Sequence, residues 1–178
     1  KSIEIISIGH RNPQGLTIDK DTNLIYSSEH GPKGGDEINT IDTTKTIQNY
    51  GWPISSYGEH YGNEKKDNSK LYKIAPLFKS HKDHGFIEPT KNYTPSIGIS
   101  ELILFDMLNQ KILLASSLGN NVSEGDMSLH IYFFDKDNLK KYKSITLNER
   151  IRDMLYLEKK NLIILFLEST SSIGVIKL

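Results

Sequence analysis

Polar residues that could bind an anionic ligand and a metal ion fall in three short clusters within the first third of the chain. The first cluster holds Arg11 in a loop rich in Gly and Pro, and the third holds Tyr50 in the string NYGWP. Between them, Gly31 and Pro32 form a bend that turns backbone carbonyls outward, and Glu37 adds a carboxylate. An arginine fork binds carboxylate or quinone oxygens, whereas Ca²⁺ takes carboxylate and carbonyl oxygens. These residue types in this order favour an anionic ligand held through a hard metal ion.

Each cluster also has an ordinary structural interpretation, which the sequence leaves open. Arg11, with Asn12 beside it, could close a surface turn, although the flanking Gly and Pro residues indicate a specified loop. The segment from Gly31 to Glu37 is equally typical of a Gly-rich hairpin loop. The hydroxyl of Tyr50 could find an acceptor in the protein core instead of a metal ion.

A pair of arginines, Arg150 and Arg152, lies near the end of the sequence. On a β-strand these two side chains point to the same face and could together grip a dianion. The alternative is a solvated charged edge in which Asp153 pairs with an arginine. The six histidines show no dependable metal-ligand spacing, although His81 and His84 leave a zinc site as a minor alternative.

The composition excludes several classes of protein. Acidic and basic residues balance at 22 each, so no basic stripe favours nucleic acid or an anionic membrane. The chain has no cysteine, which excludes disulfides, thiolate metal sites and cysteine nucleophiles. No apolar run reaches the length of a membrane span, and the sequence contains no nucleophile elbow, phosphate-binding Gly loop or dinucleotide fingerprint.

Short β-strands are the elements that must position the candidate residues. Apolar and polar residues alternate with a period of two along most of the sequence, and no sustained 3.6-residue stripe predicts a long helix. We expect strands at 3–8, 24–28, 37–41, 129–134 and 162–167. The pattern therefore predicts an all-β fold, and 178 residues fit one domain.

A weak internal repeat indicates how these strands are arranged. The segments 16–19, 102–106 and 154–158 each precede a short polar turn and a second apolar strand, at 24–28, 112–116 and 162–167. Hairpins that recur at roughly 40–50 residues are typical of a β-propeller. We expect residues 1–178 to form part of such a ring, as a piece of a longer protein, with 1–8 as the last strand of a further blade. Residues 54–92 break the repeat and predict a long, partly ordered lid over the ring face.

Taken together, the clusters resemble the glucose/sorbosone dehydrogenase family, the soluble aldose sugar dehydrogenases that use pyrroloquinoline quinone (PQQ). The matching strings are GHRNPQGL, SEHGPKGGDEIN, NYGWP, SLG at 117–119 and ERIRDM at 149–154, in family order. The resemblance implies a six-bladed β-propeller, of which this chain covers roughly the C-terminal half. It also implies a periplasmic or secreted location, an external electron acceptor and, as one option, a homodimer.

The same resemblance implies a role for each matching residue. Arg11 would lie next to the reactive quinone carbonyl and is the one catalytic residue expected here, because the family's general-base histidine lies upstream of GHRNPQ. The fragment alone is therefore expected to be inactive. The residues expected to bind PQQ are Arg11, Asn12, Tyr61, Ser96, Ser117, Leu118, Arg150 and Arg152, and those expected to bind Ca²⁺ are Gly31, Pro32, Glu37 and Tyr50.

The implied reaction is the PQQ-dependent, calcium-assisted oxidation of the C1 hydroxyl of an aldose to the lactone. Three departures from the family pattern bear on it: Gly119 replaces a lysine that contacts the cofactor in several members, Ile99 replaces a usual proline, and three extra residues separate Glu37 from Tyr50. Two alternatives stay open. One is a non-catalytic, calcium-binding propeller that binds protein or carbohydrate, and the other is a relative that has lost its activity.

Overall fold

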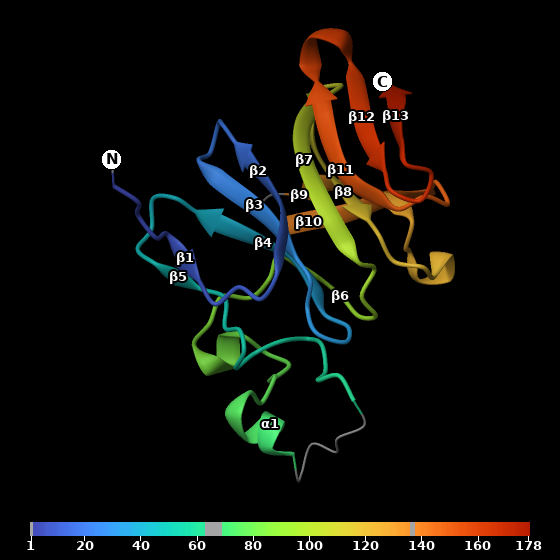
Figure 1. Ribbon diagram of the computed structural model, residues 1–178. Coiled ribbons are helices and arrows are strands. Elements are labelled where there is room, and N and C mark those ends of the chain that lie inside the picture. Colours follow the sequence, from blue (N-terminus) through green and yellow to red (C-terminus); the bar gives the residue numbers. More distant parts are fainter. Residues whose placement is uncertain (1, 63–68, 136–137) are drawn as a thin grey trace.

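Three antiparallel sheets form most of the computed structural model, which describes residues 2–62, 69–135 and 138–178 (Figure 1). The first sheet has the order β2 (Pro13–Asp19), β3 (Leu24–Glu29), β4 (Asp36–Asp42) and β6 (Lys91–Tyr93). The second has the order β7 (Ile99–Met107), β8 (Gln110–Ser117), β9 (Ser128–Asp135) and β10 (Asn138–Thr146). The third contains β11 (Ile151–Leu157), β12 (Leu162–Leu167) and β13 (Ser172–Lys177). The all-β prediction and the three repeated hairpins are confirmed.

The first strands of the three sheets lie side by side and begin at the same end. The backbone N–H of Leu16 on β2 donates to the Glu101 carboxylate on β7 over 3.2 Å. The Ser100 hydroxyl on β7 donates to the Ile151 carbonyl on β11 over 2.5 Å. Successive sheets therefore stand next to each other as blades, with the starts of β2, β7 and β11 at one level.

Each of these first strands carries a bulge close to its start. The register shifts between Pro13 and Leu16 in β2, within 99–102 in β7 and within 151–153 in β11. In the first sheet the Ser28 hydroxyl fills the bulge, accepting from the Gly15 N–H over 2.8 Å and donating to the Ser100 carbonyl. A bulge changes the direction in which the neighbouring side chains point. The same irregularity therefore sets the side-chain directions at the start of β2, β7 and β11.

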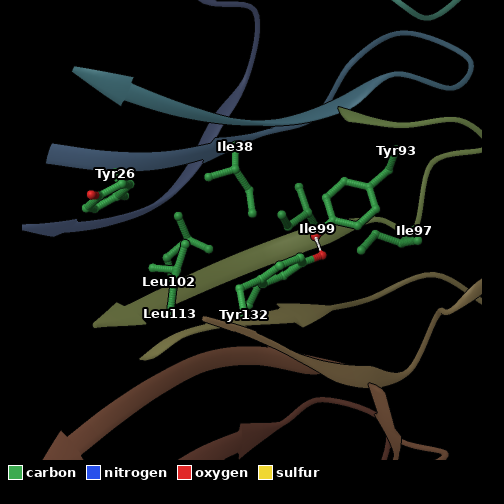
Figure 2. Close-up of a cluster of buried hydrophobic side chains, with 9 residues drawn as sticks. Tyr26, Ile38, Tyr93, Ile97, Ile99, Leu102, Leu113 and Tyr132 are labelled. Atoms are coloured by element: carbon green, nitrogen blue, oxygen red, sulfur yellow. Dashed lines mark hydrogen bonds between the residues drawn. The ribbon is translucent and has the colours of Figure 1, made fainter. Parts of the chain in front are cut away.

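The hydrophobic core lies in two layers between the blades. Strand β7 supplies both, because successive side chains on a strand point to opposite faces: Leu102 packs toward the first sheet and Ile103 toward the third. The layer between the first two sheets contains Tyr26, Ile38, Tyr93, Ile97, Ile99, Leu102, Leu113, Ala115 and Tyr132 (Figure 2). The layer on the other side of β7 contains Ile103, Phe105, Ile112, Leu114, Leu129, Ile151, Met154, Ile163 and Leu165.

The insertion at 54–92 forms a lobe that projects from one end of the first sheet (Figure 1). Isolated bridges pair Ser55 with Phe78 and Lys33 with Glu59, and a short helix α1 spans Lys70–Ile74. Single 3₁₀ turns lie at 82–84, 122–124 and 158–160. The insertion then runs into β6, which pairs with β4. Residues 63–68 of the predicted lid lie outside the described residues, and no described helix is long and apolar enough to cross a membrane.

The expected strand at 3–8 is shorter than predicted. Only β1 (Ser7–Ile8) is a strand, and it pairs in parallel with β5 (Gln48–Asn49). Ile3 is 97% exposed and Ile5 60% exposed. Alternation alone does not make a strand, because the backbone needs a partner, and within the described residues that partner reaches only two residues of this segment.

Candidate functional site

The loops that carry most of the candidate residues lie at one end of the blades. Arg11 precedes β2 and Arg150 precedes β11, at the aligned starts of the first strands. Gly31 follows β3 and Leu118 follows β8, and because these second strands run antiparallel to the first, their ends reach the same side. The topology thus brings segments from all three sheets to a common face.

Arg11 is fixed by the loop that contains the Gly-Pro bend. Its Nη1 donates to the carbonyls of His30 and Gly31 over 3.1 and 2.7 Å. Its backbone N–H donates to the Glu29 carboxylate over 2.8 Å, and its guanidinium lies 5.3 Å from the centre of the Trp52 ring. A charged fork that binds carbonyls and stacks on an aromatic face is well oriented.

Beside Arg11 lies a partly open cavity of about 10 Å³, which is space for one water molecule or one monatomic ion. Of the four residues expected to bind a metal ion, Gly31, Glu37 and Tyr50 line this cavity, whereas Pro32 does not. The complete lining is Gly9, Arg11, Glu29, His30, Gly31, Glu37, Tyr50, Trp52, Ser55, Ser56 and His81.

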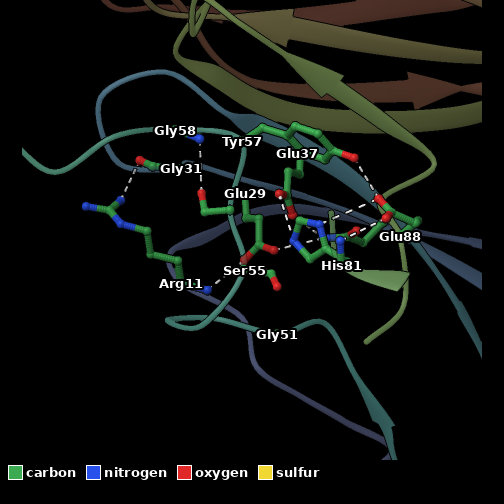
Figure 3. Close-up of polar contacts among 12 residues, drawn as sticks. Arg11, Glu29, Gly31, Glu37, Gly51, Ser55, Tyr57, Gly58, His81 and Glu88 are labelled. Atoms are coloured by element: carbon green, nitrogen blue, oxygen red, sulfur yellow. Dashed lines mark hydrogen bonds and ion pairs between the residues drawn. The ribbon is translucent and has the colours of Figure 1, made fainter. Parts of the chain in front are cut away.

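Two buried carboxylates face each other at this cavity (Figure 3). Glu29 is 4% exposed and Glu37 6% exposed, and Asn39 Nδ2 donates to both, over 2.8 and 3.3 Å. Burial, together with the neighbouring charge of Glu29, raises the pKa of Glu37 to about 8. Among the described residues, no Lys or Arg side chain forms an ion pair with either carboxylate. A bound cation would supply the charge that these two carboxylates lack.

The insertion contributes a histidine to the same cluster (Figure 3). His81 is 1% exposed, with Nε2 3.6 Å from Glu37 Oε1 and Nδ1 3.6 Å from Glu88 Oε2. Both separations are too long for hydrogen bonds, and burial lowers the pKa of His81. Glu88 is itself held by the Tyr57 hydroxyl over 2.8 Å and by the backbone N–H groups of His81 and Lys82.

The Tyr50 hydroxyl is hydrogen-bonded to an acceptor within the protein, which is one of the two arrangements that the sequence allows. That hydroxyl donates to the Thr40 carbonyl over 2.6 Å, and the His10 ring stacks on the Tyr50 ring at a centroid distance of 4.7 Å. Burial raises the pKa of Tyr50 well above its usual value. The side chain therefore lines the cavity with its hydroxyl already hydrogen-bonded.

Arg150 and Arg152 meet on one carboxylate, but it belongs to the protein. Arg150 Nε lies 3.1 Å from one oxygen of Glu168, and Arg152 Nε donates to the other over 2.7 Å. Arg150 also donates to the Leu118 carbonyl. Asp153, the alternative partner, instead accepts from the Met154 N–H over 2.7 Å. The pair does not line the Arg11 cavity, so the three arginines share a face of the molecule rather than a single cavity.

The other candidate cofactor residues differ in their exposure and contacts. Tyr61 is 66% exposed, and the Asn12 carbonyl accepts from the His30 N–H over 3.0 Å. The Ser96 hydroxyl is buried and has no hydrogen-bond partner among the described residues. Ser117 is buried, and its hydroxyl donates to the Ser128 carbonyl over 3.1 Å.

Gly119 lies against a carboxylate that leaves no space for a side chain. A Cβ built at Gly119 would come within 1.9 Å of Asp126 Oδ2. Asp126 is 4% exposed and accepts from the Asn121 N–H over 2.6 Å. The buried Asp126 carboxylate thus occupies the volume next to Gly119, and the 118–126 loop is built around a glycine at this position.

Glu29, Asn39 and Glu88 were not singled out from the sequence, and His81 was considered only as a zinc ligand beside His84, although all four surround Glu37. The signal for Glu29 and Asn39 was available, because alternation along β3 and β4 turns them to the same face as Glu37. His81 and Glu88 carry no such pattern, because they reach the cluster through the irregular insertion. The proposed pairing of His81 with His84 does not form: His84 is exposed and stacks on Phe78 at 3.8 Å.

Comparison with known proteins identifies the family. The family model described as Glucose / Sorbosone dehydrogenase matches residues 1–173. This chain belongs to the glucose/sorbosone dehydrogenase family. The predicted resemblance is confirmed, and the three sheets are blades of the family's β-propeller.

Two curated proteins and one solved structure are similar to this chain. It is 45% identical over 67 residues to the aldose sugar dehydrogenase YliI of Escherichia coli, covering 38% of this chain and 17% of that protein. It is 44% identical over 59 residues to quinoprotein glucose dehydrogenase B of Acinetobacter calcoaceticus, covering 33% of this chain and 12% of that protein. The crystal structure of the soluble aldose sugar dehydrogenase from E. coli in its apo form superposes with a TM-score of 0.75 at 25% identity. That match covers 98% of this chain and 47% of the solved one, so the chain spans about half the length of this structural relative.

Proposed function

We propose that the protein containing this chain is a quinoprotein aldose dehydrogenase that oxidises the C1 hydroxyl of a sugar to the lactone, with PQQ as cofactor and Ca²⁺ as its metal. Family membership and the named relatives support a sugar dehydrogenase. The observation that carries the proposal is the contact between Arg11 and the Gly31 carbonyl beside two buried carboxylates. This contact supports the proposal because a cationic guanidinium lies beside a pocket that contains two buried carboxylates.

The residues present fit both groups. Glu29 and Glu37 are buried without a Lys or Arg partner in the described chain, which suits a divalent cation. Arg150 and Arg152 already hold both oxygens of one carboxylate, which is the geometry that a carboxylate-bearing cofactor requires. The buried Ser96 hydroxyl has no hydrogen-bond partner among the described residues and so keeps an unused donor close to the start of β7.

When bound, PQQ supplies the acceptor for the hydride and Ca²⁺ polarises it as a Lewis acid. Arg11 stabilises negative charge that develops on an oxygen in front of it, because its orientation is fixed in advance by the loop carbonyls. Arg150, Arg152 and the exposed Tyr61 would bind and orient the cofactor, together with Asn12, Ser96, Ser117 and Leu118. Gly31, Pro32, Glu37 and Tyr50 would hold the cation. The proton of the sugar hydroxyl passes to a histidine of the upstream part of the protein.

The remaining parts of the proposal follow from the family. We place the protein in the periplasm or outside the cell, with an external electron acceptor and, as its assembly, a homodimer. The chain described here, spanning about half the length of its structural relative, is inactive by itself because it lacks the general base.

Titration of the full-length protein with PQQ, with and without Ca²⁺, tests the proposal, followed by dye reduction with a panel of aldoses. Quinone binding that needs Ca²⁺, together with sugar-dependent dye reduction, supports a dehydrogenase. Calcium binding without quinone binding or dye reduction would instead favour the non-catalytic propeller.

A further inference from the structure

Glu168 is the carboxylate that the protein itself supplies to the arginine pair. It is the first residue after β12 and begins the turn to β13. Arg150 Nε lies 3.1 Å from Glu168 Oε1. Arg152 donates to Glu168 Oε2 through Nε, over 2.7 Å, and through Nη2. The Nε groups of both arginines are therefore already occupied by a carboxylate of the same chain.

We infer that Glu168 occupies the place of a cofactor carboxylate until the cofactor binds, and that its displacement sets the affinity of the protein for PQQ. This inference rests on the proposed function, in which Arg150 and Arg152 bind the cofactor. A ligand carboxylate cannot use N–H groups that Glu168 already holds, and two carboxylates side by side disfavour each other's charge. Binding through the arginine pair therefore requires Glu168 to leave.

The Glu168 side chain can leave the arginines while the turn stays intact. The side chain is 36% exposed, and within the described residues its carboxylate accepts hydrogen bonds from Arg150 and Arg152 alone. Its backbone is fixed separately, because its N–H donates to the Arg150 carbonyl over 2.8 Å and its own carbonyl accepts from the Ser171 N–H over 3.3 Å. Rotation about the side-chain bonds of Glu168 is therefore enough to free the pair.

The nearby Glu149 shows how a carboxylate is held when the fold depends on it. Glu149 is 7% exposed, and one oxygen accepts from the backbone N–H groups of Arg150 and Ser169, over 2.9 and 2.7 Å. The other oxygen accepts from the Thr170 hydroxyl over 2.7 Å. These bonds tie Glu149 to the backbone of the turn, so a ligand cannot replace it. Glu168 is held only by two partly exposed side chains and is the displaceable carboxylate of the two.

The two arginines depend on Glu168 to different degrees. Arg150 also donates to the Leu118 carbonyl, whereas within the described chain the Arg152 side chain donates to Glu168 alone. The hydrogen bond from Arg152 is the main cause that holds the pKa of Glu168 below its usual value. Glu168 is therefore negatively charged at neutral pH, where cofactor carboxylates are charged too. Its competition with the cofactor acts mainly through Arg152.

Fluorescence titration of the full-length protein with PQQ, at a fixed concentration of Ca²⁺, tests the inference. Glu168→Gln removes the charge and keeps the size of the side chain. We expect it to tighten PQQ binding roughly three- to thirtyfold, because two exposed ion pairs no longer have to be given up. In an Arg152→Ala background the same substitution should have a much smaller effect. Glu158→Gln is the matched control, because it removes an exposed carboxylate at the other end of β11, and it should leave the affinity unchanged.

Wild-type protein that binds PQQ as tightly as Glu168→Gln, or more tightly, would overturn the inference and leave the dehydrogenase proposal standing. Urea unfolding without PQQ checks the fold of each variant, and the midpoint of Glu168→Gln should match the wild type, because exposed ion pairs contribute little to stability. If Glu168→Gln does not fold, Glu168→Ala takes its place with the same expected gain in affinity. Absence of PQQ binding by every variant would overturn the dehydrogenase proposal and this inference with it, so the two failures are distinguishable.

Discussion

The guanidinium of Arg11 donates to the carbonyl of Gly31 over 2.7 Å, and this bond ties the loop before β2 to the loop after β3. The same Nη1 also reaches the His30 carbonyl. The residue expected to stabilise charge on the quinone is thus also the residue that orders the Gly-Pro bend. Substitutions at Arg11 separate these two tasks.

Arg11→Ala should lower kcat of the full-length protein far more than it lowers calcium affinity. Loss of a preorganised donor to developing negative charge typically costs about 10²–10³-fold in rate, whereas the carboxylates at the cavity are untouched. Arg11→Lys keeps the charge but loses the fork, so it should recover only a small part of the rate. Steady-state kinetics and calcium calorimetry provide the two readouts, and wild-type turnover in Arg11→Ala would contradict the assigned role.

Arg150→Ala should weaken PQQ binding to the full-length protein at least tenfold. The substitution removes one half of the arginine pair and leaves the Leu118 carbonyl without its donor. Lys160→Ala is the control, because it removes the same charge at the opposite end of the same hairpin. PQQ affinity is measured by fluorescence titration. Equal effects of the two variants would show that the overall charge, and not the Arg150 and Arg152 pair, determines the affinity for PQQ.

Gly119→Ala should destabilise the full-length protein by about 1–3 kcal/mol, the usual cost of forcing extra volume into a packed site. The new Cβ would meet the Asp126 carboxylate, so the double variant with Asp126→Ala should be less unstable than additivity predicts. Gly174→Ala is the comparison, because the nearest atom there is the end of the Leu167 side chain at 3.0 Å. Urea unfolding of the wild type, Gly119→Ala, Asp126→Ala and the double variant measures the coupling, with Gly174→Ala as a fifth protein for comparison, and strict additivity would contradict the clash.

His130 should make the protein less stable in acid. Burial and the nearby charge of Lys141 lower its pKa to about 4 from the ordinary 6.5, against the smaller opposing effect of the hydrogen bond with the Gly125 carbonyl. The unfolded chain therefore takes up the proton first. The stability that neutral His130 contributes is complete above pH 6.5 and is lost as the pH falls toward 4.

Urea midpoints of wild type and His130→Gln at pH 7 and pH 4.5 test this expectation. The stability advantage of the wild type should be largest at pH 7 and should shrink by a few kcal/mol at most at pH 4.5. The exposed His84→Gln serves as a reference for a histidine of ordinary surroundings. An advantage that is the same at both pH values would rule out the buried neutral state of His130.

The strands could be predicted from the sequence because local alternation specifies them. Leu102 and Ile103 show why: neighbours on β7, they enter two different core layers. The predicted strand at 3–8 is longer than the observed one, because its pairing partner lies about forty residues further along the chain and local alternation does not reveal it. Strand β6 was not predicted, because it follows an irregular insertion. The family strings located the loops that hold Arg11, Gly31 and Arg150.

The interactions between those loops could not be read from the sequence in the same way. His81 lies more than forty positions after Glu37, and no periodicity relates the two residues. Arg150 and Arg152 were expected to share a face and do so, but their common partner Glu168 follows a different strand. Contacts of this kind depend on the path by which the chain brings distant segments together. The alternation of side chains along a strand carries no information about that path.

The outer surface of the third sheet has a practical consequence for laboratory work. Leu155, Phe166, Ile173 and Val175 are between 48% and 62% exposed, and contiguous apolar surface of this kind promotes aggregation. A recombinant product limited to residues 1–178 should precipitate or self-associate at concentrations suited to calorimetry. Light scattering of this product beside the longer polypeptide would reveal the difference before any ligand is added.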